Sequence, residues 1–360
     1  MGQPRQPSPS PSPSTTTLYR AGRTPWWRKR RGPGGARPRP RWSWRRRIFV
    51  ALLVLVVLVV AGGVGLYVWA GRQVRHVDAL GDYAGRPAAG KGTNWLLVGS
   101  DSRARLTPAQ RKELHVGKDV GRRTDTIMVL HSGDNGPYLV SLPRDSYLPI
   151  PGHGKGKINE AYADGGPKLL TRTVEEATGL RVDHYGEVNF LGLVQVVDAL
   201  GGVELCVDKP IKDEKSGADF AAGCREMNGT QALAYVRARY SDPAGDLGRV
   251  KRQRQLISAV SAEMLGPGVL LNPFRLVPVL DASLSALTVE NGAGVGDLVG
   301  LGWSMKDVSG AGGTATTVPV STPGVTIAGA GDVLLWDETR ASRLFRALRD
   351  DDPIPTSGTN

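Results

Sequence analysis

The chain has 360 residues, with 46 Lys and Arg against 34 Asp and Glu and a formal net charge of +12. Such a basic excess would ordinarily indicate nucleic-acid binding. However, thirteen of the basic residues lie within residues 1–47, which contain no acid, and the remaining 33 basic and 34 acidic residues nearly balance. The overall charge is therefore not evidence for a nucleic-acid-binding domain, and we expect no nucleic-acid partner.

Residues 1–47 form the first predicted segment. They are rich in Pro, Ser, Gly and Arg, with a Pro-Ser repeat over residues 7–14. This composition buries too little apolar surface to fold, so we expect a disordered basic tail. Four tryptophans lie among its arginines. They indicate either interfacial anchoring beside a membrane span or contact with a partner or anionic lipid.

Residues 48–70 are predicted to form a transmembrane signal anchor. The run 48–69, IFVALLVLVVLVVAGGVGLYVW, carries no charge. At about 1.5 Å per helical residue it spans the roughly 30 Å hydrocarbon layer. A cleaved signal peptide is the alternative, although its apolar region would be only about 7–15 residues long. The arginines at 45–47 predict a single-pass plasma-membrane protein with a cytoplasmic tail and an extracellular domain.

Residues 71–91 are expected to be a flexible linker, residues 92–349 one domain and residues 350–360 a polar tail. Short apolar runs bounded by turn residues predict strands at 94–99, 126–131, 138–142, 203–207 and 316–320. Helices are predicted at 158–163, 167–178, 191–200, 230–239, 247–265 and 337–348, and within 273–307. This alternation predicts an α/β fold with a central sheet covered by helices on both faces.

Two cysteines, Cys206 and Cys224, both fall in the predicted extracellular part. A disulfide between them would stabilise the domain by about 3 kcal/mol in the chain-entropy description. The alternative is a pair of free buried thiols. Their spacing fits neither a CxxC redox motif nor a zinc site.

Charged residues lie at the ends of the predicted strands. Asp101 follows the first strand, Arg123 and Asp125 open the second, and Arg144 closes the third. Open α/β sheets bind ligands at such edges, so these side chains are candidates for one binding site.

Further candidates lie on predicted helices. Arg237 and Arg239 occur in YVRARY, and Asp246, Arg249 and Gln253 are spaced i, i+3 and i+7 on one helix face. Arginine forks match phosphate oxygens, and carboxylates suit Mg²⁺. The pattern indicates a phosphate ligand with a divalent metal. The alternative is a set of surface salt bridges, each contributing only about 0–1 kcal/mol.

Four ordered blocks resemble the signature blocks of the LytR-CpsA-Psr family: NWLLVGSDSR, RRTDTIMVLH, SLPRDSYLPIPGHGKGKINEAYADGG and ALAYVRARYSDPAGDLGRVKRQRQ. The resemblance covers roughly residues 92–349. It implies an α/β/α sandwich with a mixed central sheet, preceded by one transmembrane helix. It also implies a phosphotransferase that moves a glycopolymer from a polyprenyl-pyrophosphate carrier to a peptidoglycan hydroxyl and forms a phosphodiester link.

The same resemblance implies a site, position by position. Asp101 and Asp125 would be ligands of Mg²⁺, or of Mn²⁺ in its place. The pyrophosphate-binding residues would be Arg123, Arg144, Arg237, Arg239, Arg249, Gln253 and Lys157. The catalytic residues would be Arg123, Asp125, Arg144, Asp246 and Arg249. Where many relatives carry two glutamines after the last arginine, this chain has Gln253 followed by Arg254.

The expected partners are the lipid-linked glycopolymer, peptidoglycan and membrane lipid. The apolar segments 190–200 and 256–287 are candidates to line a channel for the prenyl chain, with plain core packing as the alternative. Two other functions stay open at this point. One is hydrolysis of the polyprenyl pyrophosphate on the same fold, and the other is a non-enzymatic membrane-bound regulator acting through the basic tail.

Overall fold

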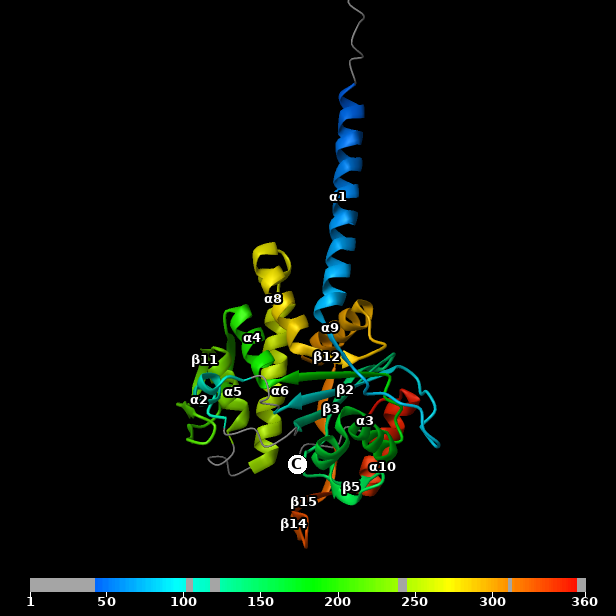
Figure 1. The fold of residues 1–360 in the computed structure, drawn as a ribbon, viewed down its shortest axis with the longest axis vertical. Coiled ribbons are helices and arrows are strands. Elements are labelled where there is room, and N and C mark those ends of the chain that lie inside the picture. The colour runs from blue at the N-terminus through cyan, green and yellow to red at the C-terminus, as the bar shows by residue number, and fades with distance from the viewer. Residues whose placement is uncertain (1–42, 102–105, 117–123, 239–244, 310–312, 355–360) are drawn as a thin grey trace, which may run out of the picture. The chain divides into compact units, whose positions relative to one another are not determined.

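The structure is a computed structural model that describes residues 43–101, 106–116, 124–238, 245–309 and 313–354 (Figure 1). The chain divides into two units, residues 1–59 and residues 60–360, and the second contains the sheet and its helices. Helix α1 (Trp44–Gln73) begins in the first unit and ends in the second. It contains the predicted apolar run and is the one described helix long and apolar enough to cross a membrane. The predicted basic tail falls almost entirely outside the described residues.

A mixed sheet forms the centre of the second unit. Its described strands are β1 (Arg75–Val77), β2 (Thr93–Ser100), β3 (Thr124–Gly133), β4 (Gly136–Ser141), β7 (His184–Asn189), β12 (Leu287–Glu290) and β13 (Thr314–Thr317). They lie in the order β1-β12-β7-β2-β3-β4-β13. Strand β2 pairs parallel with β7 and antiparallel with β3, and β3 turns at Asp134 and Asn135 into its antiparallel partner β4.

Helices cover both faces of this sheet. They are α3 (Ile158–Thr178) and α10 (Glu338–Asp350) on one face, and α8 (Pro273–Ala286) and α9 (Val295–Ser309) on the other. Strand β3 shows why, because successive side chains of a strand point to opposite faces. Ile127 and Val129 pack in the cluster that contains α3 and α10, whereas Met128 and Leu130 pack with α8 and α9. The predicted α/β/α sandwich with a mixed sheet is confirmed.

A helical subregion extends from the sheet around its own apolar cluster. It comprises α4 (Phe190–Leu200), α5 (Gly229–Arg237) and α6 (Gly245–Met264), with the strand pairs β8 (Val203–Val207) with β11 (Gly223–Met227) and β9 (Ile211–Asp213) with β10 (Ala218–Phe220). The remaining elements are α2 (Pro108–Glu113), α7 (Pro267–Leu270), β5 (Tyr147–Ile150), β6 (Gly154–Lys157), β14 (Val320–Ile327) and β15 (Gly331–Trp336). Strand β5 pairs with β6, and β14 pairs with β15.

Most predicted elements of the domain appear within a few residues of their predicted bounds. The two helices predicted at 158–163 and 167–178 form the two parts of α3, which breaks at Gly166, where φ is 64° and ψ is −155°. Strand β7 was not predicted, although it pairs directly with β2 in the middle of the sheet. Its sequence, HYGEVN, carries polar residues and a glycine rather than an apolar run.

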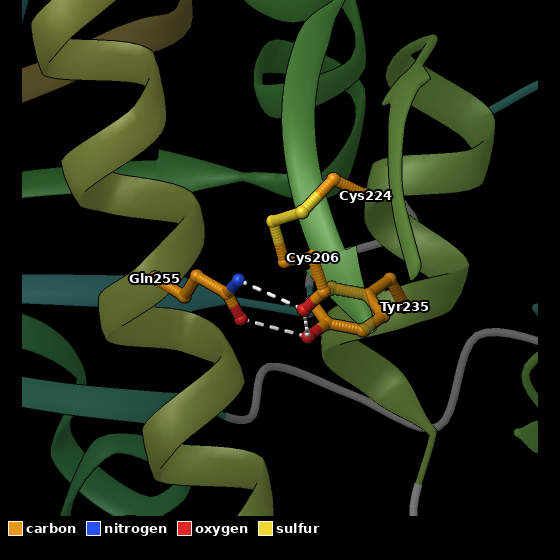
Figure 2. The surroundings of a disulfide bond; sticks show 4 residues. All are labelled: Cys206, Cys224, Tyr235 and Gln255. Atoms are coloured by element: carbon orange, nitrogen blue, oxygen red, sulfur yellow. Dashed lines mark hydrogen bonds between the residues drawn. A yellow bond between two sulfur atoms is a disulfide. The ribbon is translucent and has the colours of Figure 1, made fainter. Parts of the chain in front are cut away.

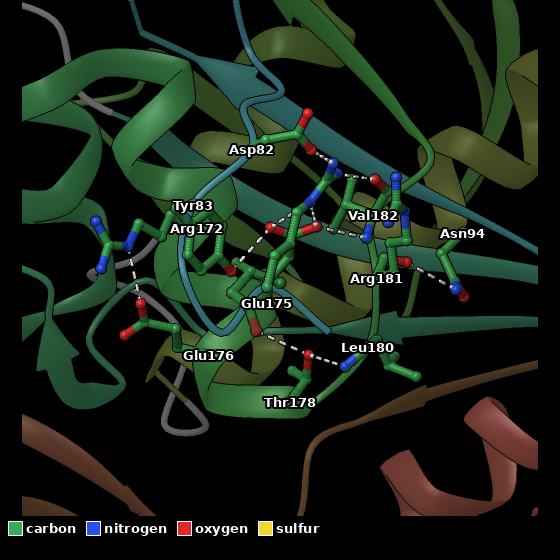
Figure 3. A network of polar contacts seen from close by, with 12 residues as sticks. Asp82, Tyr83, Asn94, Arg172, Glu175, Glu176, Thr178, Leu180, Arg181 and Val182 are labelled. Atoms are coloured by element: carbon green, nitrogen blue, oxygen red, sulfur yellow. Dashed lines mark hydrogen bonds and ion pairs between the residues drawn. The ribbon is translucent and has the colours of Figure 1, made fainter. Parts of the chain in front are cut away.

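The segment 71–91 differs from the expected flexible linker, because it packs onto α3 (Figure 3). Glu175, whose side chain is 1% exposed, accepts hydrogen bonds from Arg86 Nε at 3.0 Å and from the Tyr83 hydroxyl at 3.0 Å. The backbone N–H of Val182 donates to the same carboxylate at 3.0 Å. Burial and the Glu175 carboxylate raise the pKa of the Tyr83 phenol. A buried carboxylate needs such partners, so this segment belongs to the fold.

The expected polar tail 350–360 also begins inside the fold. Asp351, at the C-terminal end of α10, is 6% exposed and accepts a hydrogen bond from the backbone N–H of Asp134 at 2.7 Å. His131 Nε2 lies 3.4 Å from the same side chain, and its Nδ1 lies 2.9 Å from Asn94 Oδ1. The β3–β4 turn is therefore tied to the end of α10.

The two cysteines lie directly opposite each other on β8 and β11, and the structure joins their sulfurs (Figure 2). Gln255 Nε2, on α6, donates a hydrogen bond to the Cys206 carbonyl oxygen at 2.9 Å, and the Tyr235 hydroxyl donates to Gln255 Oε1 at 2.7 Å. This placement supports the predicted disulfide. The bond itself stays a prediction.

Candidate functional site

Asp125 stands at an irregularity where β2 and β3 begin their pairing. Gly99 pairs with Thr126 and Ser100 with Thr124, so Asp125 is the extra residue of a bulge. The Thr124 hydroxyl lies 2.9 Å from the carbonyl oxygens of both Gly99 and Thr126, which holds this shape. Bulges of this kind re-aim a side chain and often stand next to active sites.

Arg144 reaches Asp125 from the loop between β4 and β5. Its Nη1 donates to Asp125 Oδ1, and its Nε lies 3.4 Å from Asp145 Oδ2. The side chains of Arg144 and Asp125 are 19% and 27% exposed, respectively. Each therefore keeps an accessible edge for a ligand while the pair is held together.

Arg249 reaches the same carboxylate from α6. Its Nη1 lies 3.9 Å from Asp125 Oδ1, and the residue is 6% exposed. Arg252 and Gln253 on the same helix are also buried, and Arg252 Nη2 donates to the carbonyl oxygen of Ala238 at 2.5 Å. Burying two arginines on one helix turn is costly unless anionic or polar groups face them. The predicted face containing Arg249 and Gln253 therefore points inward.

Lys157 joins this group through Asp145. Its Nζ lies 3.5 Å from Asp145 Oδ1, so Asp145 bridges Lys157 and Arg144. The backbone N–H of Asn159, at the start of α3, donates to the Arg144 carbonyl at 3.3 Å. Asn159 Oδ1 is buried and has no hydrogen-bond partner among the described residues. Asp145 and Asn159 were not among the predicted site residues, although both lie in the quoted LPRD and GKINEAY sequences.

Asp101 follows the last residue of β2, and the preceding Ser100 pairs with Thr124 beside Asp125. Asp101 is 6% exposed. Within the described residues there is no group of three or more His, Cys, Asp or Glu side chains that would form an all-protein metal cage. Mg²⁺ usually takes only one or two carboxylates, with phosphate and water completing its shell. One carboxylate directly after β2 and one on its partner β3 fit that pattern.

The other predicted residues are placed differently or lie beyond the described part. Arg237 Nη1 donates to the Leu114 carbonyl at 2.8 Å, and its guanidinium lies 5.3 Å from the centre of the Phe190 ring. It thereby ties α5 to the end of α2 and to α4. Arg123, Arg239 and the side chain of Asp246 lie outside the described residues, and the backbone of Asp246 belongs to α6.

A cavity of about 270 Å³ opens between α6, α9 and the sheet. Its lining includes Leu139, Ile257, Met305 and Val308, with Lys251 and Arg254. Arg254 Nη1 donates to the Ala315 carbonyl at 3.0 Å, and burial lowers the pKa of this guanidinium. Of the two predicted channel segments, 256–287 contributes to this cavity through Ile257 and Ser258, whereas 190–200 packs largely into the helical subregion.

Residues 71–350 match the LytR_cpsA_psr family, so the match begins at residue 71 rather than 92. The chain is 46% identical over 285 residues to a probable cell wall biosynthesis protein, LcpB, of Corynebacterium glutamicum, covering 78% of this chain and 66% of that protein. It is 42% identical over 146 residues to TagU of Enterococcus faecalis, named a polyisoprenyl-teichoic acid–peptidoglycan teichoic acid transferase, covering 40% of this chain and 48% of that protein.

A solved LytR-Csp2A-Psr enzyme from Actinomyces oris shares the fold. It superposes with a TM-score of 0.57 at 21% identity, covering 77% of this chain and 96% of that one. The chain spans about two thirds of the length of LcpB and about half of that of TagU.

Proposed function

Because the chain belongs to the LytR-CpsA-Psr family, we propose that it is a phosphotransferase of cell-wall assembly. The donor would be a glycopolymer carried on a polyprenyl pyrophosphate, and the acceptor a peptidoglycan hydroxyl. The observation that carries this proposal is the convergence of Arg144 and Arg249 on Asp125, at the N-terminal end of strand β3. The name of TagU, which specifies teichoic acid transfer to peptidoglycan, supports the same substrate class.

The reaction requires charge compensation more than covalent chemistry. The acceptor oxygen would bond to the phosphorus that bears the sugar, the bond to the bridging oxygen would break, and polyprenyl monophosphate would leave. Arginine forks bind phosphate oxygens bidentately and offset the charge that develops on the leaving group. In this chain Arg144 and Arg249 would do so, with Lys157 adding charge from the other side of Asp145. The acceptor's proton would pass to Asp125 or Asp246.

We propose Mg²⁺, with Mn²⁺ as a substitute, as the cofactor. Asp101 and Asp125 would hold it, since they come from paired strands and carboxylates are its preferred protein ligands. When bound, the ion supplies Lewis-acid charge to the phosphate oxygens. Asp125 would also position the two arginines, because its contacts with Arg144 and Arg249 hold them beside the proposed ion.

We also propose that α1 is a single-pass anchor with the sheet-containing unit outside the cell. The arginines at 45–47 stand at one end of the apolar run, which is the arrangement of the positive-inside rule. A donor with a prenyl chain stays in the bilayer, so an enzyme anchored there meets it at a higher effective concentration. The cavity between α6 and α9 is the candidate site for part of the prenyl chain.

Reconstitution tests the transfer directly. Full-length protein in lipid nanodiscs is supplied with Mg²⁺ and a radiolabelled glycan on polyprenyl pyrophosphate, with and without a peptidoglycan oligomer. Labelled peptidoglycan formed only with acceptor supports transfer, and free phosphorylated sugar released regardless of acceptor assigns hydrolysis instead. If neither product forms, the proposal fails, and the result supports the alternative of a non-enzymatic membrane-bound regulator. A variant lacking residues 1–34 separates that role, because a transferase keeps its activity without this part of the tail.

A further inference from the structure

The segment connecting α6 to α8 carries an exposed apolar tip. Leu271 and Phe274 are 82% and 88% exposed, and Leu270 and Val277 beside them are also exposed. The stretch 265–280, LGPGVLLNPFRLVPVL, contains one charged residue, Arg275, and no acid. A contiguous patch of exposed apolar side chains often marks a binding surface. We call Leu270, Leu271, Phe274 and Val277 the α8 tip.

The backbone of the α8 tip is held in place by a helix cap, buried neighbours and a hydrogen bond to α4. Asn272 caps α8 by accepting a hydrogen bond from the backbone N–H of Phe274 at 3.0 Å. Val269 and Val279 on either side are fully buried. Arg275 Nη2 donates to the Leu200 carbonyl at 2.8 Å and so fastens the segment to α4. The apolar side chains are therefore held outward by a fixed backbone.

The C-terminal end of α1 packs against the same helix. Ala70 and Val74 are buried in one cluster with Leu284 of α8. Gln73 Nε2 donates a hydrogen bond to Asp281 Oδ1, also on α8. Phe274 is seven residues from Asp281 along α8, or about 10 Å at the helical rise. The apolar tip and the end of the candidate membrane helix are thus neighbours on one side of this unit.

A second exposed apolar face lies on α9, next to the same end of α1. Gly71 lies against Val295, the first residue of α9. Further along α9, Val299 and Trp303 are exposed at i and i+4, and Lys306 Nζ lies 5.0 Å from the centre of the Trp303 ring. Trp and Lys side chains are typical of the membrane–water interface, where the ring is partly buried and the amine stays in water.

We propose that the α8 tip and the α9 face with Val299 and Trp303 form a second contact with the bilayer, inserted shallowly into the outer leaflet beside α1. This inference rests on the proposed membrane anchoring. The occupant is lipid because both faces adjoin the end of an apolar helix and because Trp303 and Lys306 have the pairing typical of the membrane–water interface. Two points of attachment would fix the orientation of the domain relative to the bilayer. The candidate site around Asp125 would then stay at a constant distance from the lipid phosphates of the donor.

Lipid-quenching fluorescence tests this on the full chain. Two variants that each add one cysteine, Leu271→Cys and Trp303→Cys, are labelled with an environment-sensitive thiol dye and reconstituted into nanodiscs that contain nitroxide lipids. Leu55→Cys in α1 reports anchoring. Ala328→Cys, exposed in the turn between β14 and β15, is the matched control. Unsubstituted protein treated with the dye supplies the blank, because the two native cysteines are joined in the structure.

We expect dyes at residues 271 and 303 to be quenched and blue-shifted, whereas the dye at residue 328 is not. Nitroxides at shallow acyl positions should quench more than deep ones, since interfacial segments enter only about 5–10 Å. Quenching at residue 55 with none at 271 and 303 overturns this inference and leaves the anchor intact. Absence of quenching at all four positions overturns the anchor as well. A third result also overturns the lipid contact. If unlabelled Leu271→Cys forms disulfide-linked dimers and the labelled variant shows no quenching, the tip binds a second copy of this chain.

Discussion

Arg249 Nη1 lies 3.9 Å from Asp125 Oδ1, although Arg249 belongs to α6 and Asp125 lies at the start of β3. Arg144 donates to the same oxygen from a third segment. Three separate parts of the chain therefore converge on one carboxylate oxygen. The proposed phosphate site rests on this convergence.

Arg249→Ala should reduce transfer about 100-fold or more, because loss of one preorganised charge donor at a reacting phosphate removes transition-state stabilisation. The thermal midpoint should stay within a few degrees of the parent value. Nanodisc transfer kinetics and thermal unfolding measure the two effects. Arg343→Ala, at an exposed position on α10, is the matched control and should retain activity. A collapse of folding in Arg249→Ala would assign this arginine a structural role.

Chelation of divalent ions should abolish transfer, and added Mg²⁺ or Mn²⁺ should restore it. Asp101→Asn should raise the Mg²⁺ concentration needed for half-maximal activity by at least about tenfold, the loss typical even of an outer-sphere partner. Titration of activity with Mg²⁺ in both proteins measures this shift. Full activity in the chelator would show that no such ion takes part.

Replacing both cysteines by serine should lower the free energy of unfolding by about 3 kcal/mol, since the cross-link restricts the unfolded chain. Chemical denaturation of Cys206→Ser/Cys224→Ser measures the loss. The parent protein treated with reductant should show a similar loss, and peptide mass spectrometry without reduction should recover the linked pair. Unlinked peptides from protein secreted into an oxidising compartment would refute the disulfide.

Glu175→Gln should destabilise the fold by about 3–5 kcal/mol, because it leaves the buried Arg86 with only the fully exposed Asp82 as a counter-charge. The released segment should also be cut faster by trypsin after Lys91, since Arg86 precedes a proline and is resistant. Limited proteolysis and denaturation measure the two effects. Glu176→Gln is the matched control, since Glu176 pairs with Arg172 at the surface and such a pair contributes only about 0.3–0.5 kcal/mol. Equal losses in the two variants would contradict the importance of the buried network.

Acid should weaken the tie between α10 and the β3–β4 turn. Burial lowers the pKa of His131 below its usual 6.5. Burial opposes the shift at Asp351, but the backbone N–H of Asp134 and the His131 ring hold the pKa of that carboxyl below 3.8. Both groups bind protons more weakly in the folded state, so their contribution is complete above the unfolded pKa values and is lost as pH falls.

The free energy of unfolding should therefore decline first below about pH 6.5, as the unfolded His131 binds a proton, and further below about pH 4. Asp351→Asn should cost about 1–3 kcal/mol at neutral pH and flatten the second decline. The left-handed backbone at this position, with φ 53°, suits asparagine. Denaturation at a series of pH values checks this, with the exposed neighbour variant Asp350→Asn as control. Parallel curves for Asp351→Asn and the parent would contradict it.

Much of the local structure could be predicted from sequence because local patterns encode it. The uncharged run in α1, the apolar runs of β2, β3 and β4, and the i, i+3, i+7 spacing around Arg249 each require only neighbouring residues to interpret. The family blocks likewise grouped Asp125, Arg144 and Lys157, which the structure links directly or through Asp145. The strand β7 escaped prediction because its polar sequence is stabilised by pairing with β2 rather than by its own pattern.

Only the tertiary structure decided which distant groups meet. Asp145 became part of the site because Lys157 and Arg144 both approach it. Arg237, grouped with the phosphate-binding residues by its motif, donates to the Leu114 carbonyl, and its role in phosphate binding stays a prediction. The segment 71–91 joined the domain because Glu175, far along the chain, needs Arg86 for its buried charge. Sequence spacing sets which side chains share a strand or helix face, whereas burial and charge pairing between separate elements depend on how the whole chain closes.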